Sequence, residues 1–355
     1  MPEPLKLAVA GLGRIGAIHA LHAAELAAET GDCRLVAAVD ADRERARSIA
    51  EELSVQQGSE VAAFTTVEAL IEAGTCEATV VCTPTDLHRA HTTALVEAGQ
   101  RVLLEKPLTE SLSEAREFGA ELEAGFPQAA MLAFQRRFDE PLIGAKQLCE
   151  QGAIGRRFKI VSVLEDSAPL PQGYLSPGLF SSTSVHNVDE VLWLSGQTPV
   201  RAASVGSLLF GHRSSLVPED FDDGLTFLWF PDDLIAQITV SRNHVSGYRI
   251  ETWIFGEEGH IHVGRFEQNK NEVILEAYGR GERIEYKSFP MRDYRRPVPE
   301  FVERFGLAYK QELAEFVSCC REGRAFSVTH REGLRAMEVI AAGLRGAVEP
   351  SDVRL

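Results

Sequence analysis

The sequence predicts an α/β protein in two parts, a doubly wound parallel sheet followed by an α+β part with a large, open, mostly antiparallel sheet. Strands and helices alternate through about residue 128, and a glycine-rich turn joins the first strand to the first helix. After about residue 151, strand follows strand with short turns between them. We therefore place a first domain at residues 1–128 and a second at residues 129–355, with two final helices free to pack back on the first domain.

The first element is a buried strand that ends in a glycine-rich turn. Residues 5–10 lead directly into Gly11-Leu12-Gly13-Arg14-Ile15-Gly16, and a helix follows over Ala17–Ala28. Gly11 permits the tight turn, Gly13 lets the backbone approach a pyrophosphate, and Gly16 lets helix and strand pack closely. Because the helix N-terminus supplies free N–H groups for phosphates, this arrangement predicts a Rossmann dinucleotide-binding site.

An acid at the end of the second strand indicates which nicotinamide cofactor is used. Cys33–Val39 is predicted as a strand, and Asp40 follows it. A carboxylate there accepts hydrogen bonds from the ribose hydroxyls and repels a 2′-phosphate. Arg43 lies nearby and is an alternative partner for a phosphate, although arginines on helix surfaces are common. We expect NAD in preference to NADP.

Two further strands of the first part end in residues suited to the cofactor crevice. Thr79–Cys82 leads into Thr83-Pro84, and Val102–Leu104 leads into Glu105-Lys106-Pro107. Pro107 has no N–H to donate and holds Lys106 out of helical geometry. A lysine at the carboxyl end of a parallel strand points toward the crevice where such sheets bind ligands. A solvated loop lysine is the simpler interpretation, but the preceding dinucleotide fingerprint favours a functional one. The other expected elements are a strand closing at Phe64 and helices at Asp42–Leu53, Val67–Ala73 and His88–Ala98.

The second part is predicted to be rich in strands. Ser111–Ala124 is the last expected helix of the first part, with a capping box at Ser111/Glu114. In the second part the expected helices are Leu142–Gln151, Glu300–Cys320 and Thr329–Leu344, the last with a capping box at Thr329/Glu332. The expected strands are Ala129–Phe134 and about 158–164, 204–210, 224–230, 234–241, 249–255, 260–263, 271–276 and 283–289. This small number of helices can cover only one face of such a sheet. The other face is then expected to meet another subunit, which predicts a homo-oligomer, a dimer or a tetramer.

A helix that starts near Ser184 carries polar groups near its beginning. Val185, Val188 and Leu192 form its apolar stripe, and His186 and Asp189 lie three residues apart on another face. A single helical histidine is usually structural. Two polar groups facing the same way at the start of a buried helix favour a functional site.

Composition excludes several classes of partner. The net charge of −16 disfavours nucleic acid and anionic membranes, and no apolar run approaches the ~20 residues of a membrane span. We see no signal peptide, and the six cysteines form no zinc or disulfide pattern, so we expect a cytoplasmic protein with reduced thiols. His19, His22, His88 and His91 lie at spacings of three on helices, but no further ligand is spaced to join them, so we expect no metal site.

Taken together, these motifs resemble the Gfo/Idh/MocA family of NAD(P)-dependent oxidoreductases, which includes glucose–fructose oxidoreductase, inositol dehydrogenase and rhizopine-catabolism proteins. The resemblance covers nearly the whole chain. It rests on the glycine turn, Cys82-Thr83-Pro84 with His88, Glu105-Lys106-Pro107, Arg136-Arg137-Phe138, His186-Asn187-Val188-Asp189, Ser241-Arg242 with Gly247-Tyr248, and Phe301-Val302-Glu303-Arg304-Phe305 with Ala308-Tyr309 and Glu312-Leu313. The last two segments look most like the inositol 2-dehydrogenase branch.

The resemblance implies hydride exchange between a nicotinamide and a carbon of a sugar or cyclitol. Lys106 would match the family's catalytic lysine and His186 its catalytic histidine. The cofactor-binding residues would be Gly11, Gly13, Arg14, Ile15, Gly16, Asp40, Thr83, Pro84, His88, Glu105 and Lys106. The residues facing the polyol or sugar substrate would be Arg137, Asp166, Ser182, Asp189 and Tyr248.

One departure from the family pattern bears on the substrate. Many members carry an Asp four residues before the histidine, where this chain has Ser182. A serine cannot replace a carboxylate as the partner of a lysine or as a bidentate acceptor for a diol. Two alternatives remain open: a dehydrogenase or reductase of a carboxylated or imine substrate, with Arg136 or Arg137 binding the acid, and a catalytically weak sensor that keeps the NAD fold.

Overall fold

A computed structural model describes residues 3–167, 178–208, 220–264, 271–294 and 297–346. The chain forms two compact units. The first contains Met1–Gln135 with Leu307–Leu334, and the second contains Arg136–Gly306 with Arg335–Leu355. The two final helices, α8 (Glu300–Glu322) and α9 (His330–Arg345), therefore each contribute residues to both units.

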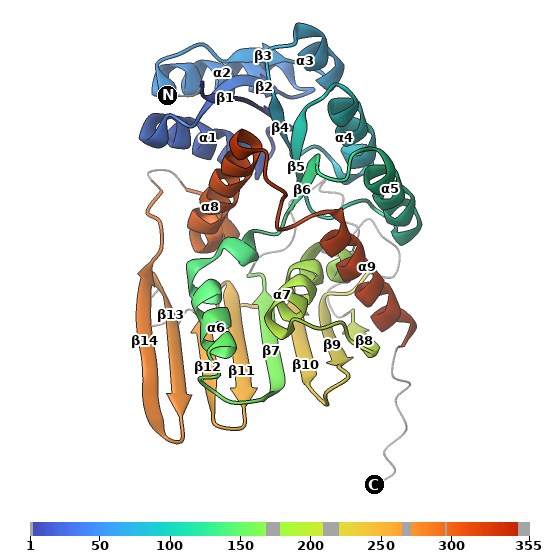
Figure 1. Cartoon of the computed structure of the whole chain (residues 1–355), viewed down its shortest axis with the longest axis vertical. Helices are drawn as coiled ribbons and strands as arrows, with labels where there is room; N and C mark the ends of the chain where they lie inside the picture. The colour runs from blue at the N-terminus through green and yellow to red at the C-terminus, as the bar shows by residue number, and fades with distance from the viewer. Residues whose placement is uncertain (1–2, 168–177, 209–219, 265–270, 295–296, 347–355) are drawn as a thin grey trace. The chain divides into compact units, whose positions relative to one another are not determined.

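The first unit is built on a parallel sheet of six strands in the order β3-β2-β1-β4-β5-β6 (Figure 1). Its strands are β1 (Leu5–Ala10), β2 (Cys33–Val39), β3 (Ala62–Phe64), β4 (Ala78–Val81), β5 (Arg101–Glu105) and β6 (Ala130–Ala133). Its helices include α1 (Gly16–Thr30), α2 (Arg43–Gln57), α3 (Val67–Ala73), α4 (His88–Glu97) and α5 (Leu112–Gly125). The strand order reverses between β1 and β4, and doubly wound sheets bind ligands at such a point. This confirms the doubly wound sheet expected from the sequence.

The first unit extends beyond residue 128. β6 pairs in parallel with β5, from Val102 opposite Ala130 to Glu105 opposite Ala133, so this strand completes the first sheet and does not begin the second. All four residues of β6 are buried, as expected for a strand covered on both faces.

The second unit contains a sheet of eight strands in the order β14-β13-β12-β11-β7-β10-β9-β8. The strands are β7 (Arg157–Glu165), β8 (Arg201–Ser207), β9 (Asp223–Trp229), β10 (Ile235–Ser241), β11 (Arg249–Gly256), β12 (Gly259–Gly264), β13 (Glu272–Gly279) and β14 (Glu282–Pro290). All neighbouring pairs are antiparallel except β7 and β10, which run parallel. The mostly antiparallel sheet is thus confirmed. The strand predicted at 204–210 begins three residues earlier, at Arg201, and residues 209 and 210 lie outside the described residues.

Two helices lie on one face of this second sheet, in front of the strands in Figure 1. α6 (Glu140–Glu150) packs on β12 and β13, and α7 (Val185–Ser195) packs on β7 and β10. Along β9, Gly224, Thr226 and Leu228 are buried, whereas the alternate residues Leu225, Phe227 and Trp229 are half-buried. This alternation is typical of a sheet with one covered face and one open face.

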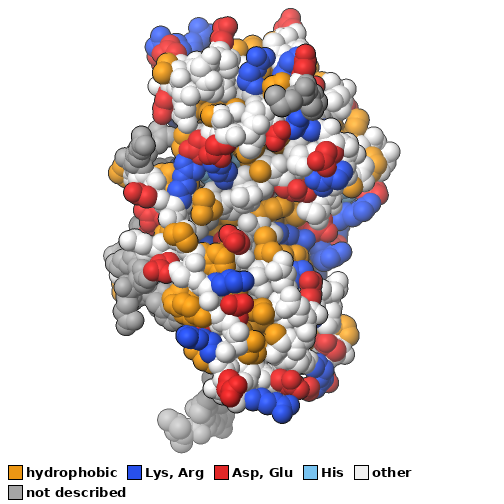
Figure 2. Space-filling model, turned by 60° about the vertical axis from the view of Figure 1, so that its left-hand side comes forward, with side chains coloured by type: hydrophobic (Ala, Val, Ile, Leu, Met, Phe, Trp, Pro, Cys, Tyr) orange, Lys and Arg blue, Asp and Glu red, His pale blue; other side chains and the backbone are white. Residues whose placement is uncertain are grey.

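Charged side chains of both signs lie on the face of the molecule that Figure 2 shows. On the side of the molecule shown in Figure 2, Lys and Arg side chains are interspersed with Asp and Glu side chains. None of the described helices is long and apolar enough to span a membrane.

Candidate active site

The glycine loop after β1 has the geometry that a dinucleotide site requires. Gly11 has a φ of 85°, and a Cβ there would lie 2.5 Å from the carbonyl oxygen of Cys82. A Cβ on Gly16 would lie 1.7 Å from the Gly11 oxygen, so only glycine fits at either position. A Cβ on Gly13 would meet nothing within 4 Å. The first and third glycines are therefore required by packing, while the open space at the second fits the approach of a pyrophosphate.

The carboxylate of Asp40 is oriented by its neighbours. Its Oδ2 accepts a hydrogen bond from the Leu12 N–H at 2.8 Å, and its Oδ1 accepts one from the Asp42 N–H at 2.8 Å. The arginine that contacts this carboxylate is Arg45, whose Nη1 lies 3.2 Å from Oδ1. Asp40 is 9% exposed, so the acid at the end of β2 is fixed at the edge of the loop, where a ribose is expected.

His88 connects the two loops that follow β4 and β5. Its Nε2 lies 3.0 Å from the Thr83 carbonyl oxygen, and its Nδ1 lies 2.8 Å from the Pro107 carbonyl oxygen. Burial lowers the pKa of His88, while these two carbonyls oppose the shift in part. The ring is 2% exposed, so its structural effect is to hold Thr83 and Pro107 at a fixed separation.

Lys106 follows the last residue of β5, and the carboxylate before it faces the protein interior. Glu105 Oε1 lies 3.0 Å from His19 Nε2, and its Oε2 accepts a hydrogen bond from the Lys106 N–H at 3.2 Å. His19 is fully buried and belongs to α1, the helix that begins at Gly16. Any contact of Glu105 with a cofactor is therefore expected through its main chain. Sequence reasoning considered His19 only as a metal ligand, although its place on the first turn after Gly16 was a signal of a role near the loop.

In the second unit, α7 is fixed by a buried carboxylate that sequence reasoning missed. Glu190 accepts a hydrogen bond from Arg136 Nη1 at 2.6 Å through Oε2, and bonds from Ser162 Oγ at 2.8 Å and Thr252 Oγ1 at 2.7 Å through Oε1. Asn187 Nδ2 donates to Ser162 Oγ at 2.8 Å. A glutamate directly after Asp189 and four residues after His186, in a helix with Val188, Val191 and Leu192, was the signal available in the sequence.

His186, the predicted catalytic histidine, is the second residue of this anchored helix and is 9% exposed. Asp189, one turn later, accepts two hydrogen bonds from Arg137, at 2.9 Å from Nε and 2.6 Å from Nη2. Asp189 is 1% exposed. The structure thus pairs Arg137 with Asp189, two residues that the sequence analysis assigned separately to the substrate. Arg136 is also buried, at 2% exposed. In contrast to Arg137, its Nε and Nη2 have no hydrogen-bond partner among the described residues.

Tyr248 and Asp166 belong to a second group of polar residues in this unit. Asp166 follows β7 and is tied to the next segment by hydrogen bonds from its N–H to Ser241 and from the His244 N–H to its own carbonyl, both at 2.9 Å. Burial raises the pKa of Tyr248, and the nearby Asp166 raises it further, while Arg136 opposes the shift. Tyr248 is thus a neutral phenol at physiological pH.

Ser182 lies in a π-helical turn, Phe180–Ser184, just before α7. Its Oγ donates to the Gly178 carbonyl at 2.7 Å and accepts a long hydrogen bond, 3.5 Å, from Arg242 Nη2. Arg242 is 1% exposed in its side chain and forms a buried ion pair with Asp220. Short π-helical turns often occur at functional sites.

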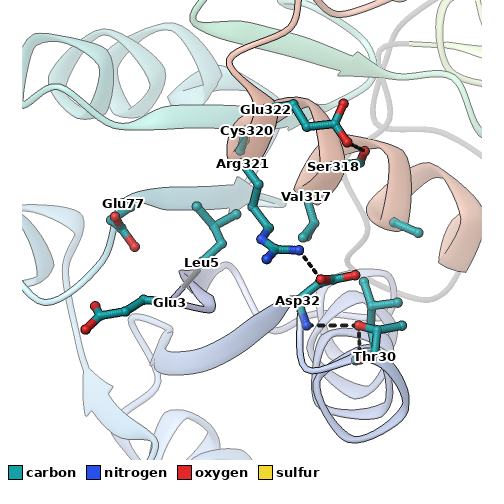
Figure 3. Close-up of a pocket in the computed structure, with 12 residues that line it drawn as sticks. Glu3, Leu5, Thr30, Asp32, Glu77, Val317, Ser318, Cys320, Arg321 and Glu322 are labelled. Atoms are coloured by element: carbon teal, nitrogen blue, oxygen red, sulfur yellow. Dashed lines mark hydrogen bonds and ion pairs between the residues drawn. The ribbon is translucent and has the colours of Figure 1, made fainter. Parts of the chain in front are cut away.

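The predicted catalytic residues belong to different units, Lys106 to the first and His186 to the second. A separate cavity of about 560 Å³ lies in the first unit, at the start of β1 and β2 (Figure 3). Leu5 and Asp32 line it together with Arg321, which points toward Asp32 and pairs with it. Because the glycine loop lies at the opposite ends of the strands, this cavity is not the dinucleotide site. Among the described residues, no group of His, Cys, Asp and Glu side chains is placed to hold a metal ion.

Comparison with known proteins matches both parts of the chain to family models. Residues 5–124 match the model of an oxidoreductase family with an NAD-binding Rossmann fold, and residues 148–355 match that family's C-terminal alpha/beta domain. The chain is 29% identical over 344 residues to the scyllo-inositol 2-dehydrogenase (NAD(+)) of Bacillus subtilis (strain 168). This alignment covers 96% of this chain and 93% of that relative.

Other relatives carry similar names. The myo-inositol 2-dehydrogenase of Thermotoga maritima is 27% identical over 353 residues, 99% of this chain and 98% of the relative. The crystal structure of a myo-inositol dehydrogenase from Corynebacterium glutamicum superposes with a TM-score of 0.78 at 24% identity, covering 97% of this chain and 96% of that one. This last likeness supports the fold alone.

Proposed function

Because this chain belongs to the Gfo/Idh/MocA family of NAD-binding oxidoreductases, we propose that it exchanges a hydride between NAD and a secondary alcohol or ketone of a sugar, cyclitol or related polyol. One observation carries the proposal. Lys106 follows β5 in the same unit as a glycine loop with an open second glycine and an oriented Asp40. The names of the relatives, inositol 2-dehydrogenases, support the substrate class.

In this proposal the protein contributes position, charge and a proton acceptor. NAD, when bound, supplies the hydride acceptor at its nicotinamide ring. Lys106 donates a hydrogen bond to the reacting oxygen and stabilises the negative charge that develops there. His186 accepts the hydroxyl proton, because histidine titrates in the range that suits a base at neutral pH.

The polar groups of the second unit suit a ligand with several hydroxyls. Tyr248 stays a protonated phenol and can donate, Asp166 can accept, and Arg136 keeps buried N–H groups without a partner among the described residues. Hydroxyls both donate and accept, so such a mixture recognises a polyol. Arg137 already has a bidentate carboxylate partner in Asp189, so a carboxylated substrate would have to compete with that pair.

The test measures NADH formation with a panel of inositol isomers, sugars and sugar acids, and NADH consumption with a panel of imines. We expect turnover with a polyol or sugar and a loss of ~10²–10⁴-fold in kcat for Lys106→Ala and for His186→Ala, the usual cost of removing a general acid–base group. NAD binding should persist in both variants. Lys287→Ala, an exposed lysine on β14, is the matched control and should stay within about twofold of wild type.

Two results would decide against the proposal. Turnover confined to carboxylated or imine substrates would favour the alternative reductase, and NAD binding without turnover on any substrate would favour the sensor. Near-wild-type kcat in His186→Ala would show that the base lies elsewhere.

We further propose that the open face of the eight-stranded sheet binds a second copy of this chain, giving a dimer or tetramer. On β11, Trp253 and Phe255 are half-buried, while Thr252 and Ile254, which alternate with them, are buried. On β9, Phe227 and Trp229 repeat the pattern. Two strands of the sheet, separated by β7 and β10, thus place aromatic rings on the face that α6 and α7 do not cover. A second copy fits because an apolar face of this kind on a sheet is usually covered in proteins.

A further inference from the structure

The carboxylate of Glu105 joins the cofactor-binding helix to the main chain of Lys106. We infer that His19 is a positioning residue for Lys106 and that it acts through Glu105. The inference rests on the proposed role of Lys106 in hydride exchange. It assigns a role to a histidine that touches neither the substrate nor the reacting atoms in the proposed function.

The two oxygens of Glu105 contact different partners. Oε1 lies 3.0 Å from His19 Nε2, and Oε2 accepts the Lys106 N–H at 3.2 Å. Glu105 is 6% exposed and His19 is fully buried, so water does not replace either partner readily. A carboxylate oxygen accepts hydrogen bonds, so the contact with Oε1 is a hydrogen bond in the tautomer of His19 that carries its proton on Nε2.

The ring of His19 is also held from another direction. It meets the ring of Tyr309 edge to face, at 5.6 Å between centroids and 85° between planes. Tyr309 lies in the part of α8 that belongs to the first unit. Three elements, α1, α8 and the end of β5, therefore meet at this pair of side chains, and the orientation of the Glu105 carboxylate is determined by all of them.

The segment around Lys106 has a separate anchor on its other side. The Pro107 carbonyl lies 2.8 Å from His88 Nδ1. Removing His19 leaves that anchor in place but frees the Glu105 carboxylate to rotate away from the Lys106 N–H. The expected result is a small displacement of Lys106 with the fold retained. A displacement of ~1 Å at a reacting group costs about 10²-fold in rate.

Dinucleotide binding should be affected much less. The glycine loop and Asp40 make their contacts through Gly11, Gly16 and the Leu12 N–H, none of which involves His19 or Glu105. The inference therefore predicts a loss in kcat with little change in NADH affinity. Damage to the whole first unit would lower both.

The experiment compares four variants of the full chain, with the substrate found by the panel. His19→Phe keeps the ring and removes the hydrogen bond, whereas His19→Gln keeps an N–H donor at the same distance from Cβ. Glu105→Gln removes the charge. His330→Phe is the matched control, because His330 is also buried in the first unit and lies 3.3 Å from the Glu123 carboxylate. NADH affinity is measured by its fluorescence.

We expect His19→Phe and Glu105→Gln each to lower kcat by about 10- to 100-fold with NADH affinity within about threefold of wild type. His19→Gln should recover at least half of the loss on a logarithmic scale, and His330→Phe should keep its kcat within about twofold. Since His19 acts through Glu105, the double variant His19→Phe/Glu105→Gln should lose no more than the worse single variant.

The possible failures are distinguishable. If Lys106→Ala loses turnover but His19→Phe keeps wild-type kcat, the positioning role is wrong and the proposed function stands. If Lys106→Ala keeps turnover, the proposed role of Lys106 is wrong and this inference fails with it. If the wild type turns over no polyol or sugar, the proposed function itself fails. Additive losses in the double variant would contradict action through Glu105. If His19→Phe does not fold, Glu105→Gln and His19→Gln carry the same comparison, and wild-type kcat in Glu105→Gln overturns the inference.

Discussion

Glu190 is the residue whose removal should most disturb the second unit. The change is Glu190→Gln, which keeps the size of the side chain and removes its charge. Glu190 is fully buried and Arg136 is 2% exposed, so the variant leaves the guanidinium charge without its carboxylate in a region closed to water.

The magnitude follows from these contacts. Breaking a buried ion pair by removing one partner costs about 3–5 kcal/mol, because the remaining charge is uncompensated. Ser162 and Thr252 also donate to Oε1 of Glu190. In Glu190→Gln, the amide oxygen of the glutamine would face Arg136, and its NH₂ group would then face these two hydroxyls. A hydroxyl retains the ability to accept, so this adds at most about 1 kcal/mol. A loss of about 3–5 kcal/mol is a large part of the ~5–15 kcal/mol that stabilises a typical domain.

The assay is urea unfolding followed by tryptophan fluorescence. All three tryptophans, Trp193, Trp229 and Trp253, belong to the second unit, so the signal reports on the unit that contains Glu190. Glu257→Gln is the matched control, since Glu257 pairs with Arg156 while both side chains are more than half exposed. It should cost no more than about 1 kcal/mol. If Glu190→Gln loses less than the control does, the buried network does not hold α7 as we argue.

Further predictions concern the cofactor, the assembly and the response to pH. Asp40→Ala should weaken NAD binding about 10- to 100-fold by removing charge-assisted hydrogen bonds to the ribose and should relax rejection of NADP; steady-state kinetics showing that the wild type prefers NADP would contradict this. Trp253→Glu should dissociate the oligomer, and sedimentation velocity showing a monomeric wild type at micromolar concentration would refute the interface. Burial lowers the pKa of His88 from its ordinary 6.5, so its contribution to stability is fully present above that value and is lost as pH falls from 6.5 toward the folded pKa. Urea unfolding should show this as a loss of up to about 1.4 kcal/mol per pH unit, which His88→Gln removes. The raised pKa of Tyr248 predicts that Tyr248→Phe leaves the alkaline side of the kcat profile unchanged below pH 10, the ordinary value for tyrosine.

The parts of the fold that depend on local pattern could be predicted from the sequence. β2 occupies Cys33–Val39 as expected, because a short apolar run lies between Gly31 and Asp40. β8 was displaced by three residues in the prediction. Its residue Ser204 is polar yet buried, hydrogen-bonded to Thr226 across the strands at 2.9 Å, so no apolar alternation marks the strand. The parallel pairing of β7 with β10 depends on the position of strands far apart in the chain, which no local pattern encodes.

In the candidate site, too, some features follow from local sequence patterns and others depend on contacts between distant residues. The glycine loop and Asp40 follow from spacing, since each lies at the end of a strand in one βαβ unit. The partners of the functional side chains do not follow from spacing. Arg137 meets Asp189 across 52 residues, and His19 meets Glu105 across 86, and both pairs form only when distant elements pack together. The sequence therefore allows a prediction of which residues carry the chemistry, but not of the partners that hold them.

Ser182 shows why this distinction matters for the substrate. In relatives with an Asp four residues before the histidine, that position carries a negative charge, and in this chain it carries a hydroxyl that contacts Arg242. The buried guanidinium of Arg242 is already balanced by Asp220, so the serine does not leave the charge of Arg242 unpaired. The fold therefore tolerates the change without cost to its electrostatics. We propose that Ser182, in place of the Asp that the family resemblance implies there, offers substrate hydroxyls a single hydroxyl where a carboxylate would be a bidentate acceptor. We therefore expect this chain to differ from the inositol dehydrogenases in substrate preference more than in hydride exchange.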